Sequence, residues 1–161
     1  MTSVRTPLWT LLRSRDEYGG GADLPLLTVK SDSGVGIRDL SEGRQPSEEL
    51  TGYRRVREGD LVVNKLWARF GAYGISSHEG VISPAYWVMS TDSRKVYPRY
   101  LHYLLRSAPY LHEIGRVSKN QPPNGYELPW GQFKNIEICL PGLEEQRRIA
   151  DFLDAETSRI D

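Results

Sequence analysis

The strongest constraint on the fold lies in residues 136–161, where an alternating strand leads through Pro141-Gly142 into an amphipathic helix. Residues 136–140 alternate as in a strand with one covered face. Glu144 and Glu145 fall in the first turn of the helix, where the helix dipole favours acidic side chains. The helical pattern continues to the last residue, so we expect the start of a longer helix. Its apolar side chains are Leu143, Ile149, Phe152, Leu153 and Ile160.

The remaining sequence predicts an α+β fold, with one domain of short mixed strands and mid-chain helices before that final helix. Apolar runs bounded by turn residues predict strands at 24–29, 61–64, 71–75 and 81–89, the last interrupted by Pro84. Helical spacing predicts one helix over 98–106 and another over 109–114, the second ended by Gly115. Prolines and an Asn-Gly pair exclude regular structure from 117–128.

Length and composition are those of a single globular domain. The chain has 161 residues, of which 39% are hydrophobic and 26% charged. No apolar run approaches the ~18–20 residues that a membrane-spanning helix needs, so no membrane contact is expected. Cys139 is the one cysteine, which excludes an intrachain disulfide and makes the cytoplasm the expected location. Its place in an apolar strand predicts a small buried side chain.

The sequence offers little to catalysis. His78, His102 and His112 lack metal-ligand spacing, and no phosphate-cradling loop is present, so neither a metal nor a cofactor is expected. His102 and His112 lie among aromatic residues on the predicted helices and are expected to be partly buried. Asp60 and Lys65 flank an apolar strand without the second acid that a metal-dependent nuclease needs. We therefore expect a non-enzymatic protein.

Charge is zoned along the chain although the formal net charge is +0. Residues 52–70 carry five bases and two acids, a net charge of +3. Residues 94–134 carry seven bases and two acids, a net charge of +5, whereas residues 143–161 carry a net charge of −3. A basic middle can steer a polyanion to one face of a neutral molecule, although an unevenly charged, solvated surface gives the same pattern.

Two segments have the composition of nucleic-acid contacts. Residues 64–73 mix long cations, a carboxamide and aromatics directly after a predicted strand, and residues 116–121 form a polar loop. Such side chains can reach phosphates and base edges. The alternative is that the aromatics belong to the core and the cations to ordinary surface. The candidate DNA-binding residues are Arg54, Arg55, Asn64, Lys65, Trp67, Arg69, Tyr73, Arg116, Ser118, Lys119, Asn120 and Gln121.

Five stretches, in order along most of the chain, carry a family resemblance. They are 24–29 (LPLLTV), 52–56 with 59–65 (GYRRV and GDLVVNK), 80–86 (GVISPAY), 98–105 (PRYLHYLL), and 130–133 with 140–154 (WGQF and LPGLEEQRRIADFLD). With them the chain resembles a target recognition domain from the DNA-specificity (S) subunit of type I restriction-modification systems. Pro141-Gly142 stands where the family more commonly has two prolines.

The resemblance implies a non-catalytic reader of double-stranded DNA. In that family two such domains are joined by two long helices, which set the spacing of a split site and dock methyltransferase subunits. Separate motor subunits cleave. Residues 1–142 would be the recognition domain, and 143–161 the start of a spacer helix with the apolar side chains as subunit contacts.

One domain instead of two leaves the organisation open. The chain would be a fragment of a longer subunit with a second recognition domain, or a half-subunit that pairs with its own copy. Two other readings remain: the recognition part of a single-chain methyltransferase-nuclease, and an interaction module that does not bind DNA.

Overall fold

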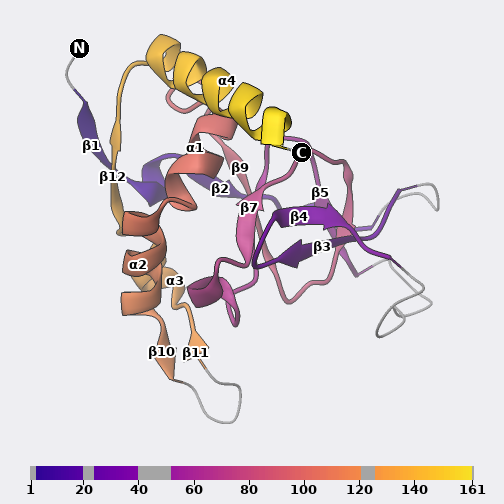
Figure 1. Ribbon diagram of the computed structural model, residues 1–161. Coiled ribbons are helices and arrows are strands. Elements are labelled where there is room, and N and C mark those ends of the chain that lie inside the picture. The colour runs from indigo at the N-terminus through magenta and orange to yellow at the C-terminus, as the bar shows by residue number, and fades with distance from the viewer. Residues whose placement is uncertain (1–2, 20–23, 40–51, 121–125, 161) are drawn as a thin grey trace.

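The computed structural model has the expected α+β fold, and it describes residues 3–19, 24–39, 52–120 and 126–160 (Figure 1). The strands are β1 (Val4–Pro7), β2 (Leu12–Ser14), β3 (Leu27–Lys30), β4 (Gly34–Ile37), β5 (Arg54–Val56), β6 (Leu61–Val63), β7 (Tyr73–Ile75), β8 (Gly80–Ile82), β9 (Trp87–Thr91), β10 (Lys119–Asn120), β11 (Tyr126–Glu127) and β12 (Glu137–Leu140). The helices are α1 (Pro98–Leu105), α2 (Ala108–Val117), α3 (Trp130–Phe133) and α4 (Leu143–Ile160), with 3-10 turns η1 (Leu8–Thr10) and η2 (Ala68–Phe70).

A four-stranded antiparallel sheet in the order β2-β9-β6-β7 forms the centre. β6 is buried on both faces because its side chains alternate between two cores. Leu61 and Val63 join the larger core, and Val62 joins the smaller one. The sheet therefore separates the mid-chain helices, which cover the larger core, from the two-stranded pairs β3-β4 and β5-β8 that close the smaller core.

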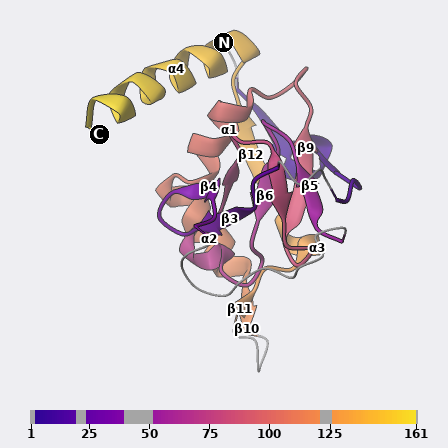
Figure 2. The same ribbon diagram turned by 90° about the vertical axis from the view of Figure 1, so that its right-hand side faces the viewer.

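The two ends of the molecule carry different elements. The antiparallel pair β10-β11 extends from one end, and α4 lies across the other, where it packs on α1 (Figures 1 and 2). In Figure 2 the C-terminal part of α4 extends past the body of the domain. Each element at the β10-β11 end is therefore remote from α4.

A buried glutamine joins α4 to the domain. Gln146 is 1% exposed, and its Nε2 donates hydrogen bonds to the carbonyl oxygens of Pro141 at 2.8 Å and Lys95 at 3.1 Å. Its Oε1 accepts one from the Tyr97 backbone N–H at 2.8 Å. Because all three partners are backbone groups, this side chain fixes where the helix leaves the domain.

Several expectations need correction. The strand predicted over 81–89 is two strands, β8 and β9, on either side of Pro84. α2 continues through Gly115 to Val117, since Gly115 does not adopt the positive φ with which a glycine ends a helix. Segment 117–128 contains β10 and β11 at its edges, while residues 121–125 lie outside the described part.

Two single-residue expectations were also wrong. Ile136, Ile138 and Leu140 are buried, so the alternation was correct, but Cys139 lies on the outer face of β12 and is exposed. His112 is exposed on α2, whereas His102 is partly buried as expected. Among the described helices, none is long and apolar enough to cross a membrane.

Candidate nucleic-acid interface

The two segments singled out by their composition lie side by side at the β10-β11 end of the domain. η2, from the first segment, packs against α2, which leads into the second. Beyond the second segment, the Leu128 N–H donates to the Lys65 carbonyl oxygen at 2.9 Å, and Lys65 Nζ lies 3.5 Å from Glu127 Oε1. Residues some fifty positions apart in sequence thus form one surface.

A cation among aromatic rings marks this surface. The Arg69 guanidinium carbon lies 3.8 Å from the centre of the Tyr126 ring and 4.5 Å from that of Phe70. The Trp67 and Phe70 rings are tilted with their centres 5.6 Å apart. Trp67 is 55%, Phe70 50% and Tyr126 43% exposed. Large aromatics at this exposure are typical of contact surfaces rather than of a core.

A hollow of about 610 Å³ lies between η2, α2 and β11. Arg69, Phe70, His112, Arg116 and Tyr126 contribute polar and aromatic side chains to its lining. Arg116 Nε donates to Glu113 Oε2 at 3.0 Å, and this bond raises the pKa of Arg116 and lowers that of Glu113. Arg116 is exposed and Glu113 partly exposed, and such an ion pair at the surface contributes little to stability.

The loop of residues 64–73 is held by local geometry. Asn64 Oδ1 accepts a hydrogen bond from the Leu66 N–H at 3.2 Å, which closes a turn directly after β6. Gly71 has a φ of +94°, and a Cβ there would lie 2.9 Å from the Ser31 carbonyl oxygen. The Arg106 guanidinium donates to the carbonyl oxygen of Gly71 at 2.6 Å and to that of Ser31 at 3.1 Å. The end of η2 is therefore fixed against α1 and the β3-β4 turn.

Two predicted DNA contacts are wrong. Tyr73 is 1% exposed in the larger core, its hydroxyl donates to the Leu105 carbonyl oxygen, and burial raises its pKa to about 12. Ser118 is buried, and its hydroxyl donates to the Ile114 carbonyl oxygen at 2.8 Å. Both hydroxyls serve the fold, so neither is available to a ligand.

Arg54 and Arg55 lie on β5, outside the hollow. The Arg54 guanidinium lies 5.3 Å from the Tyr18 ring centre, and Arg55 pairs with Glu79 at 2.9 Å. Arg54 lines a separate hollow of about 260 Å³ with Trp87 and Trp130.

The polar loop is only partly described. Lys119 and Asn120 form β10 through their backbones, and their side chains are not described. Gln121 lies outside the described residues.

Sequence reasoning missed three side chains of this surface, namely Phe70, His112 and Tyr126. Phe70 lies within the basic aromatic segment, where the alternative interpretation places it in the core, and it is not among the candidate DNA contacts. Tyr126 lay inside the segment judged irregular. The sequence signal for Tyr126 is its position: if Lys119–Asn120 pairs with Tyr126–Glu127 as two short strands, Tyr126 lies opposite Asn120.

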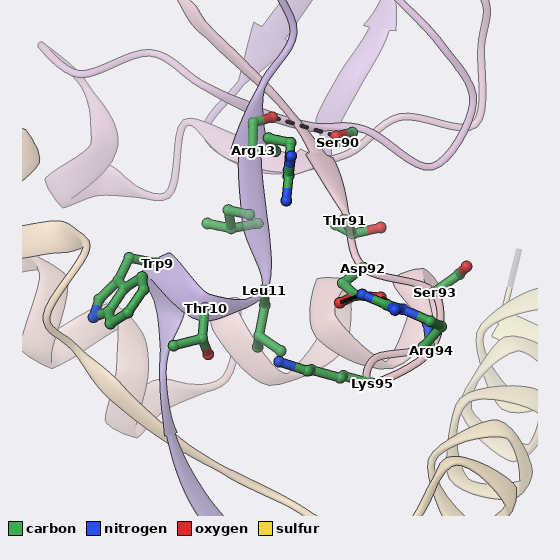
Figure 3. A pocket seen from close by; sticks show the side chains of 11 residues that line it. Trp9, Thr10, Leu11, Arg13, Ser90, Thr91, Asp92, Ser93, Arg94 and Lys95 are labelled. Carbon is green, nitrogen blue, oxygen red and sulfur yellow. Dashed lines mark hydrogen bonds and ion pairs between the residues drawn. The ribbon is translucent and has the colours of Figure 1, made fainter.

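Another hollow, of about 730 Å³, lies between residues 9–13 and 90–95 (Figure 3). Its acid, Asp92, accepts hydrogen bonds from the Arg94 side chain at 3.1 Å, and these bonds lower the pKa of Asp92. Ser90 Oγ donates to the Arg13 carbonyl oxygen at 3.4 Å. Across the described ranges no three His, Cys, Asp or Glu side chains could hold a metal.

The predicted contact face of α4 is divided by the structure. Phe152 is 63% and Leu143 37% exposed, while Ile149 and Leu153 are half-buried. The side chain of Ile160 is not described. The side of α4 that faces the domain carries Gln146, the fully buried Ala150 and Asp154, which pairs with Arg99 at 3.3 Å.

No protein-family model and no curated protein matches this sequence. Solved structures do match over 99% of the chain. The HsdS subunit from Thermoanaerobacter tengcongensis matches with a TM-score of 0.67 and 18% identity, and the type I restriction-modification S subunit from M. genitalium with 0.64 and 10%. A chain from a study of assembly and conformational transition of the type I R-M system matches with 0.58 and 18%.

The match covers only part of each of those chains. It spans 43%, 40% and 39% of their lengths in the order given, so this chain corresponds to about two fifths of each. With sequence identities of 10–18%, the similarity to these structures is a similarity of fold. The chain has the fold of a target recognition domain, with its adjoining helix, from the S subunits of type I restriction-modification systems.

Proposed function

We propose that this chain is the DNA-reading part of a type I restriction-modification specificity subunit. It binds double-stranded DNA in a sequence-specific way and directs methylation and cleavage by partner subunits. The observation that carries the proposal is the joining of residues 64–70 with Arg116 and Tyr126 into one cationic and aromatic surface. Phosphate contacts position such a protein on a duplex, and contacts to base edges specify the sequence.

The proposed division of labour follows from the two ends of the molecule. Residues 1–142 form the recognition domain, whose β10-β11 end faces DNA. Residues 143–161 begin the spacer helix, on which the exposed Leu143 and Phe152 support a subunit contact. The partner there is a second recognition domain of the same full-length chain, or a second copy, together with methyltransferase subunits. Restriction motor subunits join through the methyltransferase, and the assembly acts in the cytoplasm.

Salt-dependent duplex binding tests this function. Each phosphate contact releases counterions, so log K falls with log[salt] with a slope of about −0.9 per contact. We expect measurable binding to a labelled duplex at ~50 mM salt, strongly weakened at ~200 mM. The double substitution Arg69→Ala with Arg116→Ala should weaken binding about tenfold or more and flatten the slope by about 1–2.

The matched control is Arg13→Ala, because Arg13 is an exposed arginine of the other hollow. It should leave both the affinity and the slope unchanged. Equal binding by the wild-type chain and the double variant at ~50 mM salt would contradict the proposed surface.

A further inference from the structure

Among the described residues, Arg69 differs from Lys65 and Arg116 in having no anionic partner. Lys65 is paired with Glu127 and Arg116 with Glu113. Among the described residues no carboxylate pairs with Arg69, and none accepts a hydrogen bond from its guanidinium. Its neighbours are the rings of Phe70 and Tyr126. Within the described ranges its N–H donors therefore have no acceptor, while its guanidinium lies against two rings.

The two rings hold the guanidinium in place before a ligand arrives. A free arginine side chain has many rotamers, and ordering it on binding costs affinity. A guanidinium over an aromatic face keeps its charge and presents its N–H donors at the edge of the plane. Phe70 adjoins Gly71, whose carbonyl oxygen accepts a hydrogen bond from Arg106 at 2.6 Å, so the segment that carries Arg69 is itself anchored.

Among the base edges of duplex DNA, the acceptor pair that such a donor pair matches is the major-groove edge of guanine. Its O6 and N7 accept two hydrogen bonds from one arginine, and no other base presents two acceptors there. Lys65 and Arg116 can exchange their carboxylates for phosphates, which positions the domain without selecting a sequence.

We propose that Arg69 reads a guanine of the target sequence in the major groove, and that Phe70 and Tyr126 are positioning residues for it. This proposal rests on the proposed function and deepens it by assigning one base of the site. Within the described surface, Arg69 sets sequence preference and Arg116 sets overall affinity.

Selection from a random duplex pool tests the assignment. The chain, its Arg69→Lys and Arg69→Ala variants, and Arg116→Ala are each incubated with the pool at low salt, and the bound duplexes are sequenced. The wild-type chain should enrich a motif with at least one fixed G·C pair. Arg69→Ala should lose that preference by about tenfold or more while the other positions persist, and Arg69→Lys, which keeps the charge but not the planar donor pair, should lose part of it. Arg116→Ala should weaken binding evenly across sequences.

A modified base gives an independent readout. A duplex with 7-deazaguanine at the assigned position lacks the N7 acceptor, so the wild-type chain should bind it about tenfold more weakly, and Arg69→Ala should not distinguish the two duplexes. Tyr126→Phe keeps the ring face and should behave as wild type. Tyr126→Ala should weaken the guanine preference.

The outcomes separate the two proposals. If the wild-type chain selects a motif and both Arg69 variants select the same motif, the role of Arg69 is overturned and the proposed function stands. Enrichment of no motif by the wild-type chain overturns both. Thermal unfolding of each variant, unchanged from wild type, shows that lost selectivity does not reflect lost folding.

Discussion

At the scale of the residue, His102 on α1 links the stability of the fold to pH. Its Nδ1 accepts a hydrogen bond from the Ile75 backbone N–H at 3.1 Å, so the folded protein needs the neutral imidazole. Burial, reinforced by the charges of Arg99 and Arg106, lowers its pKa to about 4. In the unfolded chain the histidine has its ordinary pKa, near 6.5. Between pH ~4 and pH ~6.5, His102 is therefore protonated in the unfolded chain and neutral in the folded protein.

His102 therefore predicts a pH dependence of stability. Its contribution is complete above pH ~6.5 and is lost as the pH falls towards 4, because the unfolded state binds more protons in that window. Denaturant unfolding should show a loss on the order of 1–2 kcal/mol between pH 7 and pH 5. His102→Asn keeps an acceptor for the Ile75 N–H but does not titrate, so its stability should vary less over this range. Equal pH dependence in the two proteins would contradict this account.

At the scale of the element, α4 separates a packing face from a free one. Leu153 is half-buried, whereas the neighbouring Phe152 is 63% exposed. Leu153→Asp should destabilise the free chain by about 2 kcal/mol, because it places a charge at a half-buried position. Phe152→Asp should change stability by less than about 0.5 kcal/mol but weaken association with a second copy or with the methyltransferase.

Leu153→Asp and Phe152→Asp introduce the same charge at neighbouring positions of α4, so each is the control for the other. Thermal unfolding measures the first effect, and sedimentation of the chain with its partner subunit measures the second. A large loss of stability in Phe152→Asp would show that the exposed face belongs to the fold. Unimpaired association in that variant would remove Phe152 from the proposed contact.

The elements that the sequence predicted are those whose pattern is local. β6 and β12 follow from apolar runs and alternation, and α1 and α4 follow from helical spacing, so their ranges agree with the structure within a residue or two. β1 and β4 were missed because their strand character depends on distant or glycine-rich pairing. Val4 pairs with Leu140, and Gly36 pairs with Thr28. The partner of Val4 lies outside any local window, and the two glycines of β4 hide the alternation that marks a strand.

The kinds of residue in the candidate site could be predicted from the sequence, but which individual residues belong to it could not. The cations and Trp67 follow from charge and position after a strand. Tyr73 has the same residue type as Tyr126, yet one is 1% and the other 43% exposed. Only the three-dimensional arrangement separates a core tyrosine from one that holds Arg69. Gln146 shows the same limit, since its three backbone partners come from two other segments.

At the scale of the whole molecule, the central claim is that the end remote from α4 reads DNA for partner enzymes. The most direct measurement is a map of methylated adenines in cells that carry the complete system. Three strains are compared: one with this chain, one without it, and one in which Lys65, Arg69 and Arg116 are replaced by alanine. We predict a defined motif with the wild-type chain, loss of that motif without the chain, and loss or relaxation of one half of it in the substituted strain. The same motif in all three strains would contradict the account.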